Sequence, residues 1–184
     1  FAVVIGHLGD LIRERYGTGS SLGVELTYLE QDLRSYGTGA AVLLAEEFTA
    51  GGPFFLSYGD IAIHPENYRE MAELYRQYKT MISSANWVED PALGAAVYLD
   101  EGSFLTRLVE KPPRGTSQTN WNNAGVYIFL PQVFSYLKQL TPSARGEYEL
   151  TAAVAQMAAE GVPIKVHRIT GFWQDVGSPG SAQA

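Results

Sequence analysis

The sequence contains no cysteine, which excludes disulfides, thiolate metal sites and a thiol nucleophile. It also contains no apolar run close to the roughly 18 residues that a membrane-spanning helix needs, and no secretory signal pattern is visible. We therefore expect no membrane partner. The lack of cysteine fits a reducing compartment, and we expect a cytoplasmic protein.

Positive charge is scarce as well. The chain has 13 Lys and Arg against 20 Asp and Glu, for a formal net charge of −7. Nucleic-acid backbones are bound by clustered Lys and Arg, whereas these basic residues are scattered, so we expect no nucleic-acid partner. If the protein binds phosphates, a metal ion or a few placed cations must neutralise them.

The sequence does contain enough apolar residues for a core. With 184 residues, 46% of them hydrophobic, it predicts a single domain over 1–184. Such a chain buries about 70% of the surface that it exposes when unfolded. The chain opens at Phe1 inside a strand-like run without a methionine, so we expect residues to precede it and the domain to be N-terminally incomplete.

Strand-like and helical patterns alternate along the chain, with one hairpin-like patch, and favour a three-layer α/β fold whose mostly parallel sheet is mixed. Strands are expected at 1–5, 24–29, 53–58, 81–88, 94–99, 104–109, 126–129 and 163–169. Helices are expected at 8–16, 38–48, 65–78, 131–140 and 148–159. Residues 171–177 are expected to form a turn that leads to a last helix at Pro179.

The apolar run 53–58 stops at Gly59-Asp60. An apolar run bounded by glycines predicts a buried strand of a parallel sheet, and open α/β sheets bind ligands at the carboxyl ends of such strands. Asp60 is therefore a candidate site residue. Taken alone, a Gly-Asp pair is more often an ordinary turn.

Other polar segments also border expected strands. They are Glu110-Lys111-Pro112, Asn123-Ala124-Gly125 and Trp173-Gln174-Asp175-Val176-Gly177. Each segment alone could be a turn, and Glu110 with Lys111 could be an exposed charged pair. The loop 31–39 opens a helix at Thr38, where free backbone N–H groups favour an anion, although Thr38 could equally be a plain cap.

In this order, these segments resemble the sugar-phosphate nucleotidyltransferases, the NDP-sugar pyrophosphorylases, over nearly the whole chain. The resemblance implies a Rossmann-like α/β domain that joins a nucleoside triphosphate to a sugar 1-phosphate with Mg²⁺ and releases pyrophosphate. It leans towards thymidylyl or uridylyl transfer to glucose 1-phosphate, with guanylyl transfer to mannose 1-phosphate as the alternative. The family often forms oligomers, so a homo-oligomer is possible.

The resemblance also implies roles for particular residues. Asp60 and Asp175 would hold Mg²⁺, and Lys111 would bind the sugar phosphate, which makes these three the expected catalytic residues. The residues expected to bind the nucleotide are Gln31, Gly37, Thr38 and Gly59. Those expected to bind the sugar are Gly94, Glu110, Asn123 and Gly125.

Three features depart from the family pattern. The glycine-rich phosphate loop is absent from the sequence and would lie before Phe1. The spacing from Gln31 to Gly37 is one residue longer than usual, which puts the base-reading role of Gln31 in question. The motif at 145–151 is followed by Ala152 where the family usually has Asp, so we assign that segment no catalytic role.

Other classes fit the sequence less well. A glycosyltransferase would carry a second carboxylate two residues after Asp60, where Ala62 stands. A dinucleotide-binding dehydrogenase needs Gly-x-Gly-x-x-Gly after the first strand, which Gly6 and Gly9 do not supply. A non-catalytic regulatory or assembly subunit of the same family remains open, because it could keep the fold and bind nucleotide or sugar phosphate without turnover.

Overall fold

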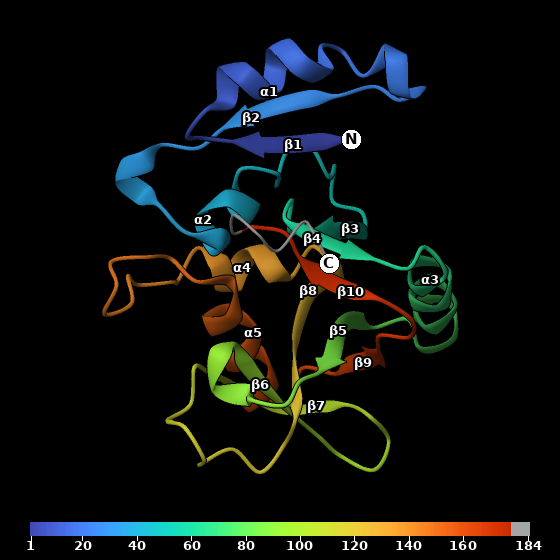
Figure 1. Ribbon diagram of the computed structural model, residues 1–184, viewed down its shortest axis with the longest axis vertical. Helices are drawn as coiled ribbons and strands as arrows, with labels where there is room; N and C mark the ends of the chain where they lie inside the picture. Colours follow the sequence, from blue (N-terminus) through green and yellow to red (C-terminus); the bar gives the residue numbers. More distant parts are fainter. Residues whose placement is uncertain (178–184) are drawn as a thin grey trace. The chain divides into compact units, whose positions relative to one another are not determined.

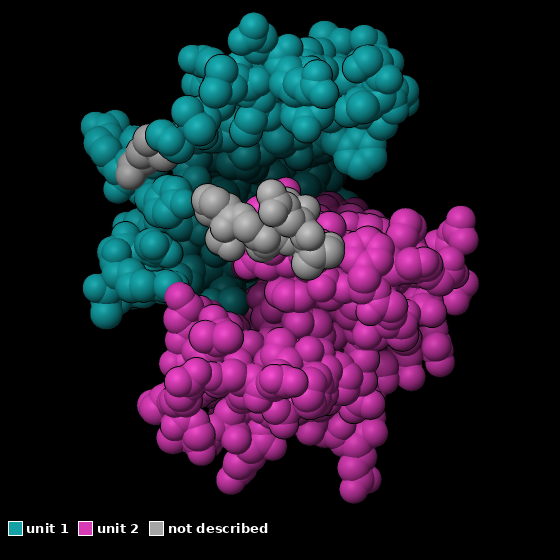
Figure 2. Space-filling view, in the orientation of Figure 1, with its two compact units in different colours: residues 1–52, 131–153 teal, residues 53–130, 154–184 magenta. Residues whose placement is uncertain are grey.

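The structure is a computed structural model that describes residues 1–177, apart from the side chain of Leu33. The helix expected at Pro179 lies outside the described residues. The chain divides into two compact units, which Figure 2 shows in different colours. One comprises Phe1–Gly52 and Pro131–Ala153, and the other comprises Pro53–Leu130 and the residues from Val154 onwards.

The first unit is built on a parallel strand pair with a helical crossover. Strand β1 (Ala2–Ile5) pairs with β2 (Thr27–Glu30), and α1 (Gly9–Tyr16) connects them (Figure 1). The strand expected at 24–29 thus begins later. Its other elements are η1 (Ser20–Leu22), η2 (Leu33–Ser35), α2 (Thr38–Leu43), α4 (Val133–Leu137) and the start of α5 (Leu150–Ala159). Helix α2 ends earlier than the expected 38–48.

The second unit holds a six-stranded sheet within the described residues. Its strands are β3 (Phe54–Ser57), β5 (Met81–Trp87), β6 (Ala95–Leu99), β7 (Leu105–Glu110), β8 (Trp121–Phe129) and β9 (Ile164–Arg168). The order is β7-β6-β8-β5-β9, with β3 also paired to β8. Strands β3, β5, β6 and β9 run in one direction and β7 and β8 in the other, so the sheet is mixed.

Strand β3 forms where the apolar run predicts it, but its surroundings differ from the expectation. It pairs antiparallel with β8, and its side chains alternate between half-buried and exposed, with Phe55 48% exposed. The expectation of a buried strand between parallel neighbours is therefore wrong. A short apolar run cannot distinguish a half-exposed strand from a buried one, because four residues carry too little periodicity.

Two further strands form where the sequence suggests only turns. Strand β4 (Ile61–Ile63) and β10 (Trp173–Asp175) pair antiparallel, apart from the six-stranded sheet. Apolar residues of this pair, Ile63 among them, pack into a buried cluster around Met71 of α3 (Glu66–Tyr78). Three-residue strands give no recognisable alternation, so sequence patterns could not reveal them.

Helix α3 follows Pro65, which pre-sets the backbone at the start of a helix. One face of the helix is packed: Met71 is fully buried, and Tyr68 and Tyr75 are half-buried against the same cluster. Among the described residues, no helix combines the length and apolar character needed to cross a membrane.

Candidate active site

Asp60 and Asp175 lie at the same end of the β4–β10 strand pair. Asp60 directly precedes β4, and Asp175 ends β10 with Ile61 as its register partner. The backbone N–H of Val176 donates to the Asp60 carbonyl at 2.7 Å, which extends the ladder by one step. Two residues far apart in the sequence therefore become neighbours through a backbone pairing.

The carboxylates of both aspartates converge on Gly177. The Gly177 N–H donates to Asp175 Oδ1 at 2.8 Å. A methyl group on Gly177 would lie only 2.7 Å from Asp60 Oδ2 and 3.1 Å from Asp175 Oδ1. Gly177 thus leaves the space in which the two carboxylates meet, a role that sequence analysis did not assign to it.

This pair of carboxylates suits a hard divalent cation. Both aspartates are exposed, so water and phosphate oxygens can complete a coordination shell. Mg²⁺ typically takes one or two protein carboxylates and keeps several waters or substrate oxygens. Among the described residues, no group of three or more His, Cys, Asp or Glu could hold a metal ion, so the candidate site within them is this pair of carboxylates.

Two hydrogen bonds also connect this region to β8, one from Tyr58 and one from Trp173 of β10. The Tyr58 N–H donates to the Gly125 carbonyl at 3.0 Å, and the Trp173 indole N–H donates to the Ala124 carbonyl at 3.0 Å. Gly125 has a φ of 78°, and a methyl group there would lie 2.8 Å from the Tyr58 ring. The space beside Gly125 is therefore occupied by Tyr58.

Asn123 lies in the same stretch of β8, and its side-chain oxygen Oδ1 already accepts hydrogen bonds. The Tyr127 hydroxyl donates to Asn123 Oδ1 at 2.7 Å, and the Gly125 N–H approaches the same atom at 3.5 Å. Burial raises the pKa of Tyr127 well above its ordinary value, so its hydroxyl stays protonated and remains a donor. These contacts orient the Asn123 amide.

The end of the β6–β7 hairpin brings three further candidates together. Glu110 is the register partner of Ala95, and the Lys111 N–H donates to the Gly94 carbonyl at 3.0 Å. Lys111 is exposed and adopts the left-handed backbone region with a φ of 41°. Glu110 is half-buried, whereas an ordinary surface pair would be exposed on both sides.

In the first unit, the Gln31 side chain bonds to backbone carbonyls of the same loop, the one expected to bind the nucleotide. Gln31 Nε2 donates to the Gly37 carbonyl at 2.8 Å and lies 3.4 Å from the Ser35 carbonyl. Gly37 has a φ of 133°, and a methyl group there would collide with the backbone of Tyr148. Only glycine fits at this position.

The segment at 145–151, which was given no catalytic role, holds this loop. The Gly39 N–H donates to the Tyr148 carbonyl at 2.7 Å, and the Tyr148 N–H donates to the Tyr36 carbonyl at 2.9 Å. The Leu150 N–H donates to Thr38 Oγ1 at 3.0 Å, so Thr38 caps the first turn of α5. Because Thr38 caps a helix that is distant in the sequence, the residues around Thr38 could not predict this contact.

Gln31 also lines a pocket of the first unit with a volume of about 670 Å³, a size suited to a small ligand. The lining residues are Ile5, Gly6, Leu8, Gly9, Asp10, Leu11, Glu30 and Gln31. Apart from Gln31, none of these lining residues was predicted from the sequence to bind a ligand. In the second unit, Gly59 is exposed, and a methyl group there would meet no atom within 4 Å.

Residues 2–183 match the sequence profile of the family described as nucleotidyl transferase. The chain belongs to the nucleotidyl transferase family. The resemblance to sugar-phosphate nucleotidyltransferases inferred from the motifs is thereby confirmed.

Curated relatives of this nucleotidyl transferase carry matching names. It is 34% identical over 179 residues to the low-salt glycan biosynthesis nucleotidyltransferase Agl11 of Haloferax volcanii, covering 96% of this chain and 49% of the relative. It is 29% identical over 179 residues to a glucose-1-phosphate thymidylyltransferase of Streptomyces griseus, covering 96% of this chain and 49% of the relative. The chain spans about half the length of these relatives.

Solved structures agree with the fold of this nucleotidyl transferase. A Bacillus anthracis protein assigned as a glucose-1-phosphate thymidylyltransferase, in complex with sucrose, superposes with a TM-score of 0.84 at 28% identity. That match covers 99% of this chain and 72% of the other. A UDP-glucose pyrophosphorylase complexed with UDP-glucose has a TM-score of 0.80 at 25% identity, covering 96% and 75%. The predicted Rossmann-like α/β fold is confirmed.

Proposed function

We propose that the protein transfers a nucleotidyl group from a nucleoside triphosphate to a sugar 1-phosphate. An oxygen of the sugar phosphate attacks the α-phosphorus, the bond to the β-phosphate oxygen breaks, and pyrophosphate leaves with the electron pair. No protein nucleophile is needed. The observation that carries the proposal is the convergence of the Asp60 and Asp175 carboxylates on Gly177 in a chain of this family.

Asp60 and Asp175 are the residues that would hold Mg²⁺. When bound there, the ion would supply positive charge that offsets the negative charge of the reacting phosphates. The chain itself carries a net charge of −7, so two polyanionic substrates cannot be neutralised by the protein as a whole. Positioning and local charge are the main contributions that phosphoryl-type transfers require of a protein.

Lys111 would bind the sugar phosphate as a compact cation at the end of β7. The bond from its N–H to Gly94 fixes where the side chain starts, while the exposed ammonium stays available to a ligand. Asn123 would donate its amide N–H groups to a sugar oxygen, because its Oδ1 already accepts from Tyr127. Glu110, half-buried and next to Lys111 in the sequence, would accept from sugar hydroxyls, and Gly94 would contribute backbone contacts.

Gln31, Gly37 and Thr38 of the first unit are proposed to contact the nucleotide. Because Gln31 Nε2 donates to Gly37 O, the amide presents its oxygen as the group left to read a base edge. An acceptor at that position matches the ring N–H of thymine or uracil, and equally that of guanine. The names of the thymidylyltransferase and UDP-glucose pyrophosphorylase relatives support thymidylyl or uridylyl transfer to glucose 1-phosphate as the proposal.

The test is pyrophosphate release from each nucleoside triphosphate paired with glucose 1-phosphate or mannose 1-phosphate, with Mg²⁺ supplied. We expect release to need both substrates and to be fastest with dTTP or UTP and glucose 1-phosphate. Asp175→Asn should lower turnover by at least about 100-fold, since charge stabilisation in such reactions contributes that much or more. Glu73→Gln, an exposed change on α3, is the matched control and should keep full activity.

Two outcomes would change the proposal. Preference for GTP with mannose 1-phosphate would make the protein a guanylyltransferase. Binding of nucleotide or sugar phosphate without any pyrophosphate release would make it the non-catalytic subunit. The single domain over 1–184 and the cytoplasmic location stay predictions.

A further inference from the structure

The geometry of the aspartate pair depends on the register of a very short strand pair. Strands β4 and β10 have three residues each and stand apart from the main sheet. A slip of one residue would turn every side chain of a strand to its other face, and Asp175 would then leave Asp60. Apolar packing of Ile61, Ile63 and Trp173 against the Met71 cluster opposes such a slip, but three-residue strands bury few side chains, so directional hydrogen bonds can add to the register.

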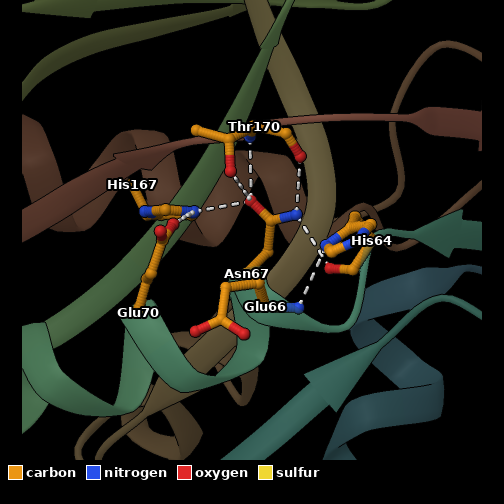
Figure 3. A network of polar contacts seen from close by, with 6 residues as sticks. All are labelled: His64, Glu66, Asn67, Glu70, His167 and Thr170. Carbon is orange, nitrogen blue, oxygen red and sulfur yellow. Dashed lines mark hydrogen bonds and ion pairs between the residues drawn. The ribbon is translucent and has the colours of Figure 1, made fainter.

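Asn67 makes directional contacts at the opposite end of this pair. It lies in the first turn of α3 and is fully buried. Its Nδ2 donates to the His64 carbonyl at 2.8 Å and to the Thr170 carbonyl at 2.9 Å (Figure 3). Its Oδ1 accepts from the Thr170 N–H at 2.9 Å and contacts His167 Nε2 at 2.8 Å.

Together with a longer contact from the Thr170 hydroxyl to Oδ1 at 3.4 Å, these contacts use the full hydrogen-bonding capacity of an asparagine side chain. Because Nδ2 faces two carbonyl oxygens, the amide can take only one orientation. Its Oδ1 is then an acceptor, so His167 Nε2 must carry the proton that it shares, with Glu70 Oε2 3.4 Å from the same nitrogen. Figure 3 shows Asn67 at the centre of this network.

The backbone partners of Asn67 flank both strands of the pair. His64 follows the last residue of β4, and Thr170 lies on the connection that leads from β9 into β10. The His64 N–H also donates to the Phe172 carbonyl at 3.1 Å, which continues the ladder towards Asn67. The Asn67 side chain therefore connects the residue after β4 to the segment that precedes β10.

We propose that Asn67 is a positioning residue that sets the register of β4 against β10 and so brings Asp60 and Asp175 together. This rests on the proposed metal-binding role of the two aspartates. Asn67 does not touch the carboxylates. It acts through the backbone of both strands, from the end away from the site.

The experiment compares Asn67→Ala with the unaltered protein by two measurements. The first is hydrogen exchange of the Val176 amide, which reports the last step of the ladder at Asp60 and needs no metal. The second is direct titration with Mn²⁺ alone as the probe. We expect faster exchange at Val176 with an unchanged Tyr58 amide, and Mn²⁺ affinity weaker by about 10- to 100-fold, the usual cost of losing a supporting contact.

A second variant sharpens the test. Asn67→Asp places an oxygen against the His64 and Thr170 carbonyl oxygens, so it replaces two attractive contacts by repulsion. We expect a larger loss of Mn²⁺ affinity than in Asn67→Ala. Equal affinity in the two variants would contradict the orientation of the amide and, with it, the proposed role.

Loss of stability alone must be separated from loss of register. Met157→Ala removes a fully buried side chain from α5 and lowers stability without touching this network. We expect it to leave Val176 exchange and Mn²⁺ affinity unchanged at temperatures where it is folded. If Met157→Ala weakens both as much as Asn67→Ala does, Asn67 is only a stabilising residue and the proposal fails.

The outcomes also distinguish this inference from the proposed function. Normal Val176 exchange and Mn²⁺ affinity in Asn67→Ala, with Mn²⁺ binding lost in Asp175→Asn, would overturn the role of Asn67 and leave the metal site standing. Absence of Mn²⁺ binding in the unaltered protein would overturn the metal site. The Val176 amide would then decide the register claim by itself.

Discussion

Lys111 illustrates how a candidate site residue can oppose stability. Its φ of 41° is in the left-handed region, which costs a non-glycine residue roughly 1–2 kcal/mol. Backbone strain of this kind persists where the surrounding structure enforces it, and it is common at functional sites. Here the Lys111 N–H bond to Gly94 closes the end of the β6–β7 hairpin.

Lys79 offers a matched comparison, because it has a φ of 53° at the C-terminal cap of α3. We expect Lys79→Gly and Lys111→Gly each to raise the free energy of unfolding by about 0.5–1 kcal/mol, since relief of strain exceeds the entropy that glycine adds to the unfolded chain. Only Lys111→Gly should raise KM for the sugar phosphate. Denaturant unfolding and steady-state kinetics measure the two effects.

A loss of sugar-phosphate binding in Lys79→Gly would contradict the assignment of Lys111, because the two changes remove the same charge and the same strain. An unchanged KM in Lys111→Gly would contradict it more directly.

The candidate site residues Asp60 and Lys111 lie beside a glycine or a proline that marks the end of an expected strand. Gly59 before Asp60, and Pro112 after Lys111, drew attention to both side chains. Gly177 and Thr38 show the limit of that approach. The spacing role of Gly177 depends on Asp60, and the capping role of Thr38 depends on Leu150, so neither has a signal in its own neighbourhood.

At the scale of elements, His167 of β9 faces α3 and couples their packing to pH. Burial lowers the pKa of His167 below its ordinary value of 6.5, and the carboxylate of Glu70 only partly opposes this. The unfolded chain therefore binds a proton at a higher pH than the folded protein does. Its contribution to stability is complete above about pH 6.5 and is lost as the pH falls below it.

We expect the melting temperature to fall between about pH 7 and pH 5.5, and His167→Gln to make that fall smaller. Thermal unfolding followed across this range in both proteins measures the difference. Identical pH dependence in the two would show that His167 does not exchange its proton differently on folding.

Elements with a long or strongly apolar pattern were predictable, and short ones were not. The hairpin of β6 and β7, the buried β5 and helix α3 all appear where their patterns indicate. Strands β4 and β10 do not carry a pattern of their own, because their three residues are held by pairing and by packing on Met71. The pair that positions the candidate metal site is therefore the part of the fold that sequence reasoning missed.

For the whole molecule, composition limits the chemistry more than it defines the substrate. The absence of cysteine excludes a thiol nucleophile, and a net charge of −7 means that any bound phosphates need a metal ion or a few placed cations to neutralise them. The family could be inferred from four ordered motifs, because each retains its residue types. Which base and which sugar are used depends on a few contacts, such as those of Gln31 and Asn123, and a homo-oligomer stays a prediction.

The most direct measurement is Mn²⁺ binding to the unaltered protein, Asp60→Asn, Asp175→Asn and the double variant. If the two carboxylates share one ion, each single change should abolish most of the affinity and the double change should add little, because residues that act on one ligand are not additive. Independent, additive losses, or undiminished binding in either single variant, would contradict a shared metal site at Asp60 and Asp175.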